Sequence, residues 1–372
     1  MKITSISFII LLSFCATTFA QSTKIERAVR DLLEPEVGPG KQIAACSVGV
    51  VCGDDVQKFS FGKFDESDDR TPDSQTIYEI ASVSKLFTGL LLADMVERGE
   101  VRLDQPLAYI LPKGTVFPEN NAKEITLEDI ATHTSGLPRL APKFWDVANQ
   151  TPGNPYSLYT TEKVFESLGQ WKPERAPKEK YEYSNYAYAL LGNSLAVQEN
   201  TTYEALLRER VLDPLKMKDT TVIVSEANME RLAPGHDGNG QKCGNWDLTG
   251  FAPGGGLHSD IDEMTRFAIA ALGRFDLLEK EVPKDANWDN LDKAFKLAMV
   301  PRADSGSDRK VGLGWNYQTA GKFHWHNGQT GGYFSMFVVD RENKIGVVIL
   351  TNSFNAAPDG IAVQILNLLR KE

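Results

Sequence analysis

The stretch that decides the fold and the chemistry of this chain is Tyr78-Glu79-Ile80-Ala81-Ser82-Val83-Ser84-Lys85, followed by the apolar residues 86–92. The pattern predicts the end of a short strand, a turn and then a helix over 82–98, whose apolar positions form one buried stripe. Ser82 and Lys85 lie on one face of that helix, so a hydroxyl and an amine meet at its N-terminus, where negative charge is favoured. These features predict Ser82 as a nucleophile whose proton Lys85 helps to remove.

The Ser-x-x-Lys pattern is short, and it occurs twice more, at Ser60–Lys63 and at Ser307–Lys310. The first copy lies in an alternating, strand-like run, in which residues three apart point to opposite faces. The second lies in a charged loop without apolar periodicity. Only Ser82 opens a helix with an apolar stripe, although a helix-capping serine is the alternative reading of that position.

Composition sets wide limits on function. The chain has 372 residues, of which 42% are hydrophobic and 24% charged, as in ordinary globular proteins. A net charge of −10 argues against a broad surface for nucleic acid or anionic membranes. No internal run is long enough to span a membrane. We therefore expect no nucleic-acid partner and no integral membrane span.

The N-terminus differs from the rest of the chain. Lys2 precedes the apolar run 6–14, and Ala20 offers a plausible cleavage site, so residues 1–20 are predicted to be a secretory signal peptide. A mature chain of residues 21–372 would then be periplasmic or secreted. Export permits disulfides, but Cys46 and Cys52 lie in one predicted strand, too far apart to bridge. Either one pairs with Cys243, or all three remain free.

The order of elements predicts an α/β (α+β) fold in which one antiparallel sheet is built from both ends of the chain. The sheet region covers about 21–80 and 310–372, and a helical lobe of about 100–300 is inserted between them. The cleft between sheet and lobe is the expected site. The expected strands are 43–51, 56–64, 311–317, 322–326, 333–339 and 345–350. The expected helices are 24–34, 82–98, one starting at 126, 186–198, 203–211, 259–272 and 361–370.

Two further stretches carry suitable polar groups. Tyr183 and Asn185 stand at the start of a predicted helix, and a nearby lysine would favour the phenolate of Tyr183, which makes it a candidate base. His326, Gly328 and Gln329 lie at a glycine-rich strand edge that a ligand backbone can approach. His324 and His326 share a face of that strand, but no third spaced ligand accompanies them, so we predict no metal site.

Taken together, the three stretches resemble a family: the serine β-lactamase and penicillin-binding superfamily, in particular its class C β-lactamases, D,D-peptidases and family VIII esterases. That group carries Ser-x-x-Lys, then Tyr-x-Asn, then Lys-Thr-Gly or His-x-Gly, in this order. Here these are Ser82/Lys85, Tyr183/Asn185 and His326-Asn327-Gly328. The resemblance covers roughly residues 25–370, and three ordered motifs are far more specific than one.

The resemblance implies a role for each residue. Ser82 would form an acyl-enzyme, Lys85 and Tyr183 would move the proton, and Asn185 would hold the substrate amide. The backbone N–H groups of Ser82 and Gln329 would bind the oxyanion. The implied substrates are D-alanyl peptides derived from peptidoglycan, or β-lactams, and no cofactor is needed.

Two departures from the family pattern bear on the substrate. Ala81 replaces a typical glycine, and His326 replaces the lysine of class C β-lactamases. If protonated, His326 would attract a substrate carboxylate, and KM for an acidic substrate would rise between about pH 5.5 and 7.5. The weaker cation favours a peptidase or a carboxylesterase over an efficient β-lactamase. A slowly acylating, non-catalytic cell-wall binding or sensor protein is a further alternative. His133, near Ser135, is predicted to be structural.

Overall fold

The structure is a computed structural model that describes residues 21–65, 67–118, 124–280 and 284–370. The predicted signal peptide, residues 1–20, lies outside the described residues. Within the described ranges, no helix is both long and apolar enough to cross a membrane. The proposed division into signal peptide and catalytic domain stays a prediction.

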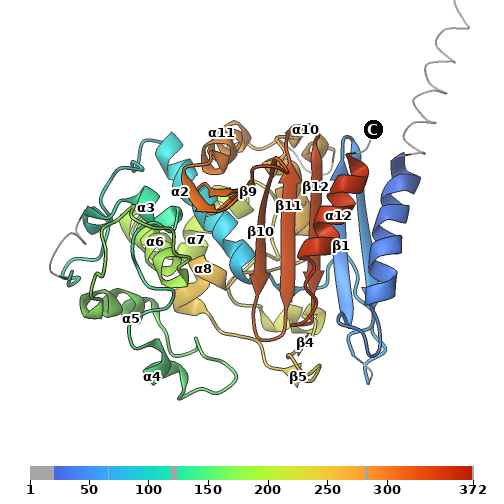
Figure 1. The fold of residues 1–372 in the computed structure, drawn as a ribbon, viewed down its shortest axis with the longest axis horizontal. Helices are drawn as coiled ribbons and strands as arrows, with labels where there is room; N and C mark the ends of the chain where they lie inside the picture. The colour runs from blue at the N-terminus through green and yellow to red at the C-terminus, as the bar shows by residue number, and fades with distance from the viewer. Residues whose placement is uncertain (1–20, 66, 119–123, 281–283, 371–372) are drawn as a thin grey trace, which may run out of the picture.

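The centre of the molecule is an antiparallel sheet of eight strands, in the order β2-β1-β12-β11-β10-β9-β8-β7 (Figure 1). Its strands come from both ends of the chain, as expected, because β1 pairs with β12, with Cys46 opposite Thr351. The strands are β1 Ala45–Cys52, β2 Asp55–Gly62, β7 Ala303–Gly306, β8 Arg309–Val311, β9 Asn316–Gln318, β10 Phe323–Gln329, β11 Phe334–Asp340 and β12 Ile345–Thr351.

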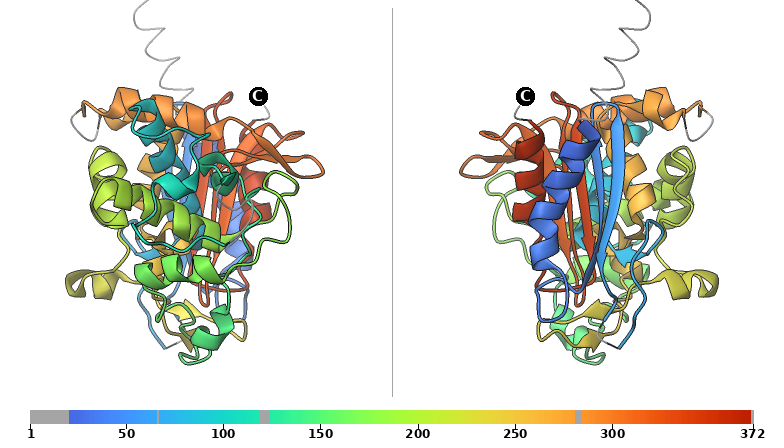
Figure 2. Two further views of the ribbon diagram at one scale, coloured as in Figure 1. Left: turned by 90° about the vertical axis from the view of Figure 1, so that its left-hand side faces the viewer. Right: turned by 90° about the vertical axis from the view of Figure 1, so that its right-hand side faces the viewer.

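Helices cover both faces of the sheet. On one face, the N-terminal helix 21–33 and α12 (Asp359–Leu369) lie side by side (Figure 2) and bury Ile25, Val29 and Leu366 against the strands. The other face packs against α2 (Ser84–Glu97) and α9 (Ile261–Ala271), with α11 (Trp288–Met299) beside them. The long apolar strands β1 and β12 are buried on both faces for this reason.

The inserted lobe is helical and lies beside α2 and β10 (Figure 1). Its longest helix is α6 (Asn185–Gln198), which packs against α2. Its other helices are α3 Leu127–Ala131, α4 Phe144–Ala148, α5 Thr161–Glu166, α7 Tyr203–Leu207, α8 Ala252–Gly255 and α10 Phe275–Leu278. Two short ladders complete the fold: β3 (Tyr78–Glu79) pairs with β6 (His258–Ser259), and β4 (Gly235–His236) with β5 (Lys242–Cys243).

The central helix α2 differs from its predicted form. A single buried stripe was expected, but every residue from Ser84 to Met95 is buried, because sheet, lobe and α11 surround the helix. Polar positions such as Asp94 are buried with partners: Arg98 donates to its carboxylate at 2.8 Å. The helix therefore runs through the core rather than over its surface, which is typical of a helix that is apolar nearly all round.

Some helix starts and strand bounds were predicted correctly from the sequence, and others were not. Thr126 caps α3, and Asp129 completes the capping box. The cap of α9 is Asp260, which accepts from the Glu263 N–H, so this helix starts at Ile261 and not at 259 as predicted. The strand predicted over 311–317 is two short strands, and β10 runs three residues further, to Gln329. The helix α11 was not predicted.

For Cys46 and Cys243, the structure decides between a disulfide and free thiols. Cys46 and Cys243 carry free thiols, so neither takes part in the disulfide that was considered for Cys243. Burial raises the pKa of the Cys46 thiol to about 12, which keeps it protonated and unreactive.

Helix α2 touches the chain between β8 and β9 through a glycine. An added Cβ at Gly89 would collide with the carbonyl oxygen of Leu313. Backbone-to-backbone contact of this kind leaves no flexible atom to move aside. The contact holds the helix that carries Lys85 against the sheet edge.

We expect Gly89→Ala to lower the free energy of unfolding by about 1–3 kcal/mol, because the added methyl group forces α2 away from Leu313. Urea denaturation followed by circular dichroism measures this loss. Gly360→Ala in α12 is the matched control, because its Cβ meets open space, and it should be neutral or stabilising by up to about 1 kcal/mol. Equal stability of the two variants would contradict the assignment.

Candidate active site

The predicted nucleophile stands on a tight turn directly before α2. Residues Ala81–Val83 form a single 3₁₀ turn, in which Ala81 has a positive φ of 48°. Ser84 fixes the turn, since its hydroxyl donates to the Ala81 carbonyl at 2.7 Å and accepts from Leu257 N–H at 3.0 Å. The alanine noted as a departure from the family's glycine therefore occupies a strained conformation, which costs roughly 1–2 kcal/mol. The next residue, Ser82, which carries the predicted nucleophilic hydroxyl, remains partly exposed.

Lys85 points from the first turn of α2 into the space between sheet and lobe. Its side chain is fully buried. Nζ donates to Asn185 Oδ1 at 2.8 Å and to the carbonyl oxygen of Gly254, and lies 3.2 Å from Ser82 Oγ. Ser82 and Lys85, the residues of the first motif, are thus in direct contact. The second motif, Tyr183/Asn185, contacts Lys85 through Asn185.

Burial, helped by the positive charge of Arg139, holds the pKa of Lys85 well below its usual range. A neutral amine has two N–H donors and one lone pair. In this neutral form, Asn185 Oδ1 and the Gly254 carbonyl can take up both donors, which leaves the lone pair available to Ser82 Oγ at 3.2 Å. In this form Lys85 can take the proton of Ser82, as a general base must.

Tyr183 approaches Ser82 from the other motif, with its hydroxyl donating to Ser82 Oγ at 2.8 Å. Burial raises the pKa of the Tyr183 phenol, although the hydrogen bond to Ser82 and the charge of Arg139 oppose the rise. We had expected Lys85 to favour the phenolate, and this expectation is wrong because burial outweighs the effect of the charges. The phenol is a proton donor at neutral pH.

His133 fixes the loop that carries Tyr183. It is buried, its Nδ1 accepts from Ser184 N–H at 3.1 Å, and its carbonyl accepts from Glu182 N–H at 2.8 Å. Its neighbour Ser135 instead accepts from Leu137 N–H. The structural role predicted for His133 agrees with these contacts.

The end of β10 forms the other wall of the site. An added Cβ at Gly328 would lie 2.8 Å from Ser82 N and would collide with the Ile80 carbonyl, so only glycine lets the strand pass this close. Ser335 of β11 also donates to that carbonyl, at 2.7 Å. The pairing brings the backbone of β10 beside Ser82 N, where the predicted oxyanion donors belong.

A small cavity of about 30 Å³ opens in front of Ser82. Asn185 and Gln329, two of the predicted substrate-binding residues, both line it, and Gln329 Nε2 donates to the Phe354 carbonyl at 2.8 Å. The sequence did not single out the rest of its lining: Tyr156, Trp246, Leu248, Phe251, Gly254, Gly255 and Thr330. Aromatic and glycine residues in an irregular stretch gave no local signal for this position.

His326 lies at the predicted strand but does not supply a positive charge. It is 3% exposed, and its ring centroid is 6.2 Å from that of Tyr183. Burial, with a contribution from Lys85, lowers the pKa of His326 to about 3. Its Nδ1 donates to the Asn327 carbonyl at 2.6 Å. The expected titration of His326 between pH 5.5 and 7.5 is therefore wrong, since the imidazole stays neutral over that range.

Glu79 is a buried carboxylate near the site that the sequence did not identify as functional. It lies on β3, three residues before Ser82, and its Oε1 accepts from Trp246 N–H at 2.8 Å. Burial raises the pKa of Glu79 to about 7, against opposing contacts from Thr330, Trp246 and Asn245. The carboxylate thus holds one wall of the cavity in place.

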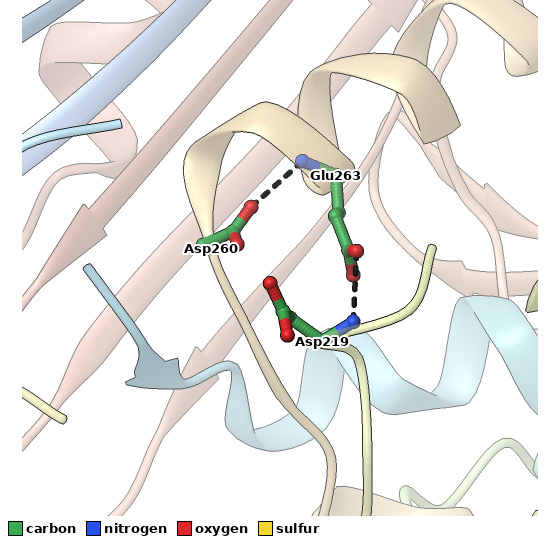
Figure 3. A group of neighbouring side chains, drawn as sticks. All are labelled: Asp219, Asp260 and Glu263. Carbon is green, nitrogen blue, oxygen red and sulfur yellow. Dashed lines mark hydrogen bonds between the residues drawn. The ribbon is translucent and has the colours of Figure 1, made fainter. Parts of the chain in front are cut away.

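Only one group of acidic side chains in the described residues has the spacing of a metal site: Asp219, Asp260 and Glu263 (Figure 3). Arg231 already donates to Asp219 at 2.8 Å and to Asp260 at 3.1 Å, and Glu263 accepts from Thr220 N–H at 2.6 Å. The positive charge that a metal would bring is supplied by the arginine. We therefore read the group as a structural ion cluster at the start of α9.

A larger cavity, of about 1,320 Å³, lies elsewhere, along residues of 38–44, 62–67, 236–242 and 353–355. It contains none of the predicted site residues. The chemistry instead converges on the small cavity at Ser82, where hydroxyl, amine and phenol are within hydrogen-bonding distance.

A serine that contacts a buried lysine and a tyrosine, beside a sheet built from both chain ends, is typical of a serine hydrolase of the β-lactamase fold. The chain belongs to the β-lactamase family, whose model matches residues 25–370. That match spans both the sheet and the inserted lobe.

Several relatives extend over nearly the whole chain. "D-alanyl-D-alanine-carboxypeptidase/endopeptidase AmpH" of Escherichia coli (strain K12) is 28% identical over 373 residues, which cover 94% of each protein. "Beta-lactamase" of the same organism is 26% identical over 391 residues, or 97% of this chain and 98% of the relative. "Putative beta-lactamase-like 1" of Homo sapiens is 29% identical over 263 residues, which cover 67% of this chain and 49% of the relative.

Tyr183→Phe removes the hydrogen bond to Ser82 Oγ and keeps the ring. We expect a loss of roughly 10²- to 10⁴-fold in acylation rate, the usual contribution of a positioned proton donor. Stopped-flow acylation measures the rate, and thermal unfolding checks the fold. Tyr181→Phe is the matched control, because in the described part of the chain Tyr181 packs against His133 and makes no hydrogen bond to Ser82; equal losses in both variants would contradict the role of the Tyr183 hydroxyl.

Glu79→Gln tests the buried carboxylate. Because its folded-state pKa is raised to about 7, Glu79 favours the folded state when protonated and loses that contribution as pH rises through 7. The glutamine stays neutral, so its Tm relative to wild type should be higher at pH 8.5 than at pH 5. Calorimetry at the two pH values measures the difference, and a pH-independent difference would contradict the raised pKa.

Proposed function

We propose that this chain is an exported serine hydrolase that forms an acyl-enzyme at Ser82 and acts on D-alanyl peptide amides, on β-lactams, or on both. The observation that carries the proposal is the position of Ser82 Oγ, 3.2 Å from Lys85 Nζ and 2.8 Å from the Tyr183 hydroxyl. The names of the full-length relatives, a D-alanyl-D-alanine carboxypeptidase and a β-lactamase, support the substrate class.

In the proposed reaction, Ser82 Oγ attacks the carbonyl carbon and its proton passes to the lone pair of Lys85. The C–N bond then breaks, and Tyr183 gives its phenolic proton to the leaving nitrogen. The proton on Lys85 returns to the phenolate, so both groups are restored. A water molecule then attacks the acyl-enzyme ester, Lys85 and Tyr183 move the protons in the same way, and Ser82 is released.

The negative charge of the tetrahedral intermediate would lie between the backbone N–H groups of Ser82 and Gln329. The close passage of Gly328 past Ser82 N supports this placement. Loss of one such donor typically costs about 3–4 kcal/mol of barrier. Asn185 would orient the substrate amide while its Oδ1 holds Lys85.

A fluorescent penicillin tests the nucleophile. The mature protein should become labelled, and mass spectrometry should place the label on Ser82, while Ser82→Ala should abolish it. Ser84→Ala is the matched control, because its hydroxyl only fixes the turn; it should retain labelling at a reduced rate. Labelling that survives in Ser82→Ala would refute the assignment.

A carboxylesterase on the same scaffold is the second candidate, and the neutral state of His326 favours it. Turnover of p-nitrophenyl esters without cleavage of a D-Ala-D-Ala peptide would select it. An acyl-enzyme that is stable on every substrate would instead select the binding or sensor protein. Export to the periplasm or medium is part of the proposal, and fractionation of cells that express the full chain tests it.

A further inference from the structure

The mouth of the site holds an arginine that no part of the proposed mechanism uses. Arg139 lies between α3 and α4, and its backbone carbonyl accepts from Asn185 N–H at 2.9 Å and from Tyr186 N–H at 3.2 Å. These two bonds tie the arginine to the start of α6, beside the second motif. Its backbone position is therefore as fixed as that of Asn185.

The side chain of Arg139 is exposed, and its guanidinium carbon lies 5.1 Å from the centre of the Tyr183 ring. Within the described ranges, Arg139 forms no ion pair. The nearby acid, Glu182, is already engaged by Arg175 at 2.6 Å. A positive charge thus stands next to a site residue without a carboxylate to neutralise it, in a chain of net charge −10.

The charge of Arg139 acts on the site. It is one cause of the lowered pKa of Lys85, and it opposes the rise that burial imposes on the pKa of Tyr183. Burial also raises the pKa of Tyr181, and Arg309 of β8 joins Arg139 in opposing that rise. The mouth of the cleft is therefore positive although the buried His326 is neutral.

The side of the substrate that Arg139 faces follows from Tyr183. In the proposed reaction the Tyr183 phenol gives its proton to the leaving group, so the leaving group must lie beside this ring. Two cations lie over this ring, but Lys85 is buried and bonded to Asn185 and Gly254. The exposed guanidinium of Arg139 is therefore the one placed to meet the leaving half of the substrate. A planar guanidinium fits a carboxylate through two parallel N–H donors.

We propose that Arg139 is a substrate-binding residue that holds a carboxylate on the leaving half of the substrate, so that the enzyme prefers amides and esters whose leaving group is an acid. The inference rests on the proposed function, because it places the leaving group beside Tyr183. It assigns the binding of a substrate carboxylate to a loop arginine, whereas the sequence predicts His326 for this role.

The experiment uses two pairs of aryl esters with the full mature chain. In the first pair the leaving group is 3-carboxyphenol or its uncharged amide, 3-carbamoylphenol. In the second pair the acyl half is glutarate monoester or its amide, with p-nitrophenol as leaving group. We expect wild type to prefer the acid of the first pair in kcat/KM by roughly tenfold or more, and to lose this preference at high salt.

Arg139→Gln should remove the preference within the first pair, mainly through KM, whereas any change that it causes through the pKa of Lys85 should be the same for the acid and the uncharged ester. Arg139→Lys should keep part of it, because the charge remains and the planar fork is lost. Arg102→Gln is the matched control for loss of one charge: its side chain is 73% exposed and pairs with Asp104. It should behave as wild type.

Three outcomes would overturn the inference: no preference within the first pair in wild type, a preference that Arg139→Gln retains, or a preference confined to the second pair. A neutral fluorophosphonate separates these from failure of the proposed function. If it labels Ser82 in wild type and in Arg139→Gln, the function stands and only the role of Arg139 is judged. If it labels neither protein, both proposals fall.

Discussion

The site depends on the burial of one amine. Taking Lys85 out of water is costly unless its N–H groups find acceptors, and the acceptors come from two other segments, Asn185 at the start of α6 and Gly254 in α8. The catalytic arrangement therefore exists only when α2, α6 and α8 are packed together. The same burial that costs stability lowers the pKa of Lys85 and turns it into a base. Burial of Lys85 Nζ thus lowers the stability of the fold and makes the amine a stronger catalytic group.

Much of this organisation could be predicted from the sequence. The order of three short motifs, together with strands at both chain ends, indicated the sheet, the lobe and the residues that meet at Ser82. Local signals also sufficed for the capping box at Thr126. Charge states could not be predicted in this way, because they depend on burial by distant segments. Tyr183 and His326 illustrate the point, since Tyr183 is half-buried and His326 is buried among neighbours far away in the sequence.

Positive charge in the cleft is distributed differently from the family pattern. A lysine in the third motif would place a cation on the rigid strand β10, opposite the lobe. Here that strand carries a neutral imidazole, and the exposed cation stands on the loop after α3, on the lobe side. A charged side chain on an exposed loop is solvated by water and can change its rotamer. A charged side chain on a buried strand instead needs a counter-charge or hydrogen-bond partners beside it.

The pairing of β1 with β12 has a consequence for the time at which the enzyme can form. Cys46 meets Thr351 across the sheet, so the sheet cannot close until nearly the whole chain is available. Contacts between such distant residues slow folding, because a long loop must be closed before they form. Gly328 lies on β10, within the part of the sheet that is synthesised last. A growing chain therefore contains Ser82 and Lys85 long before it contains a site, and it remains inert until its C-terminal strands arrive.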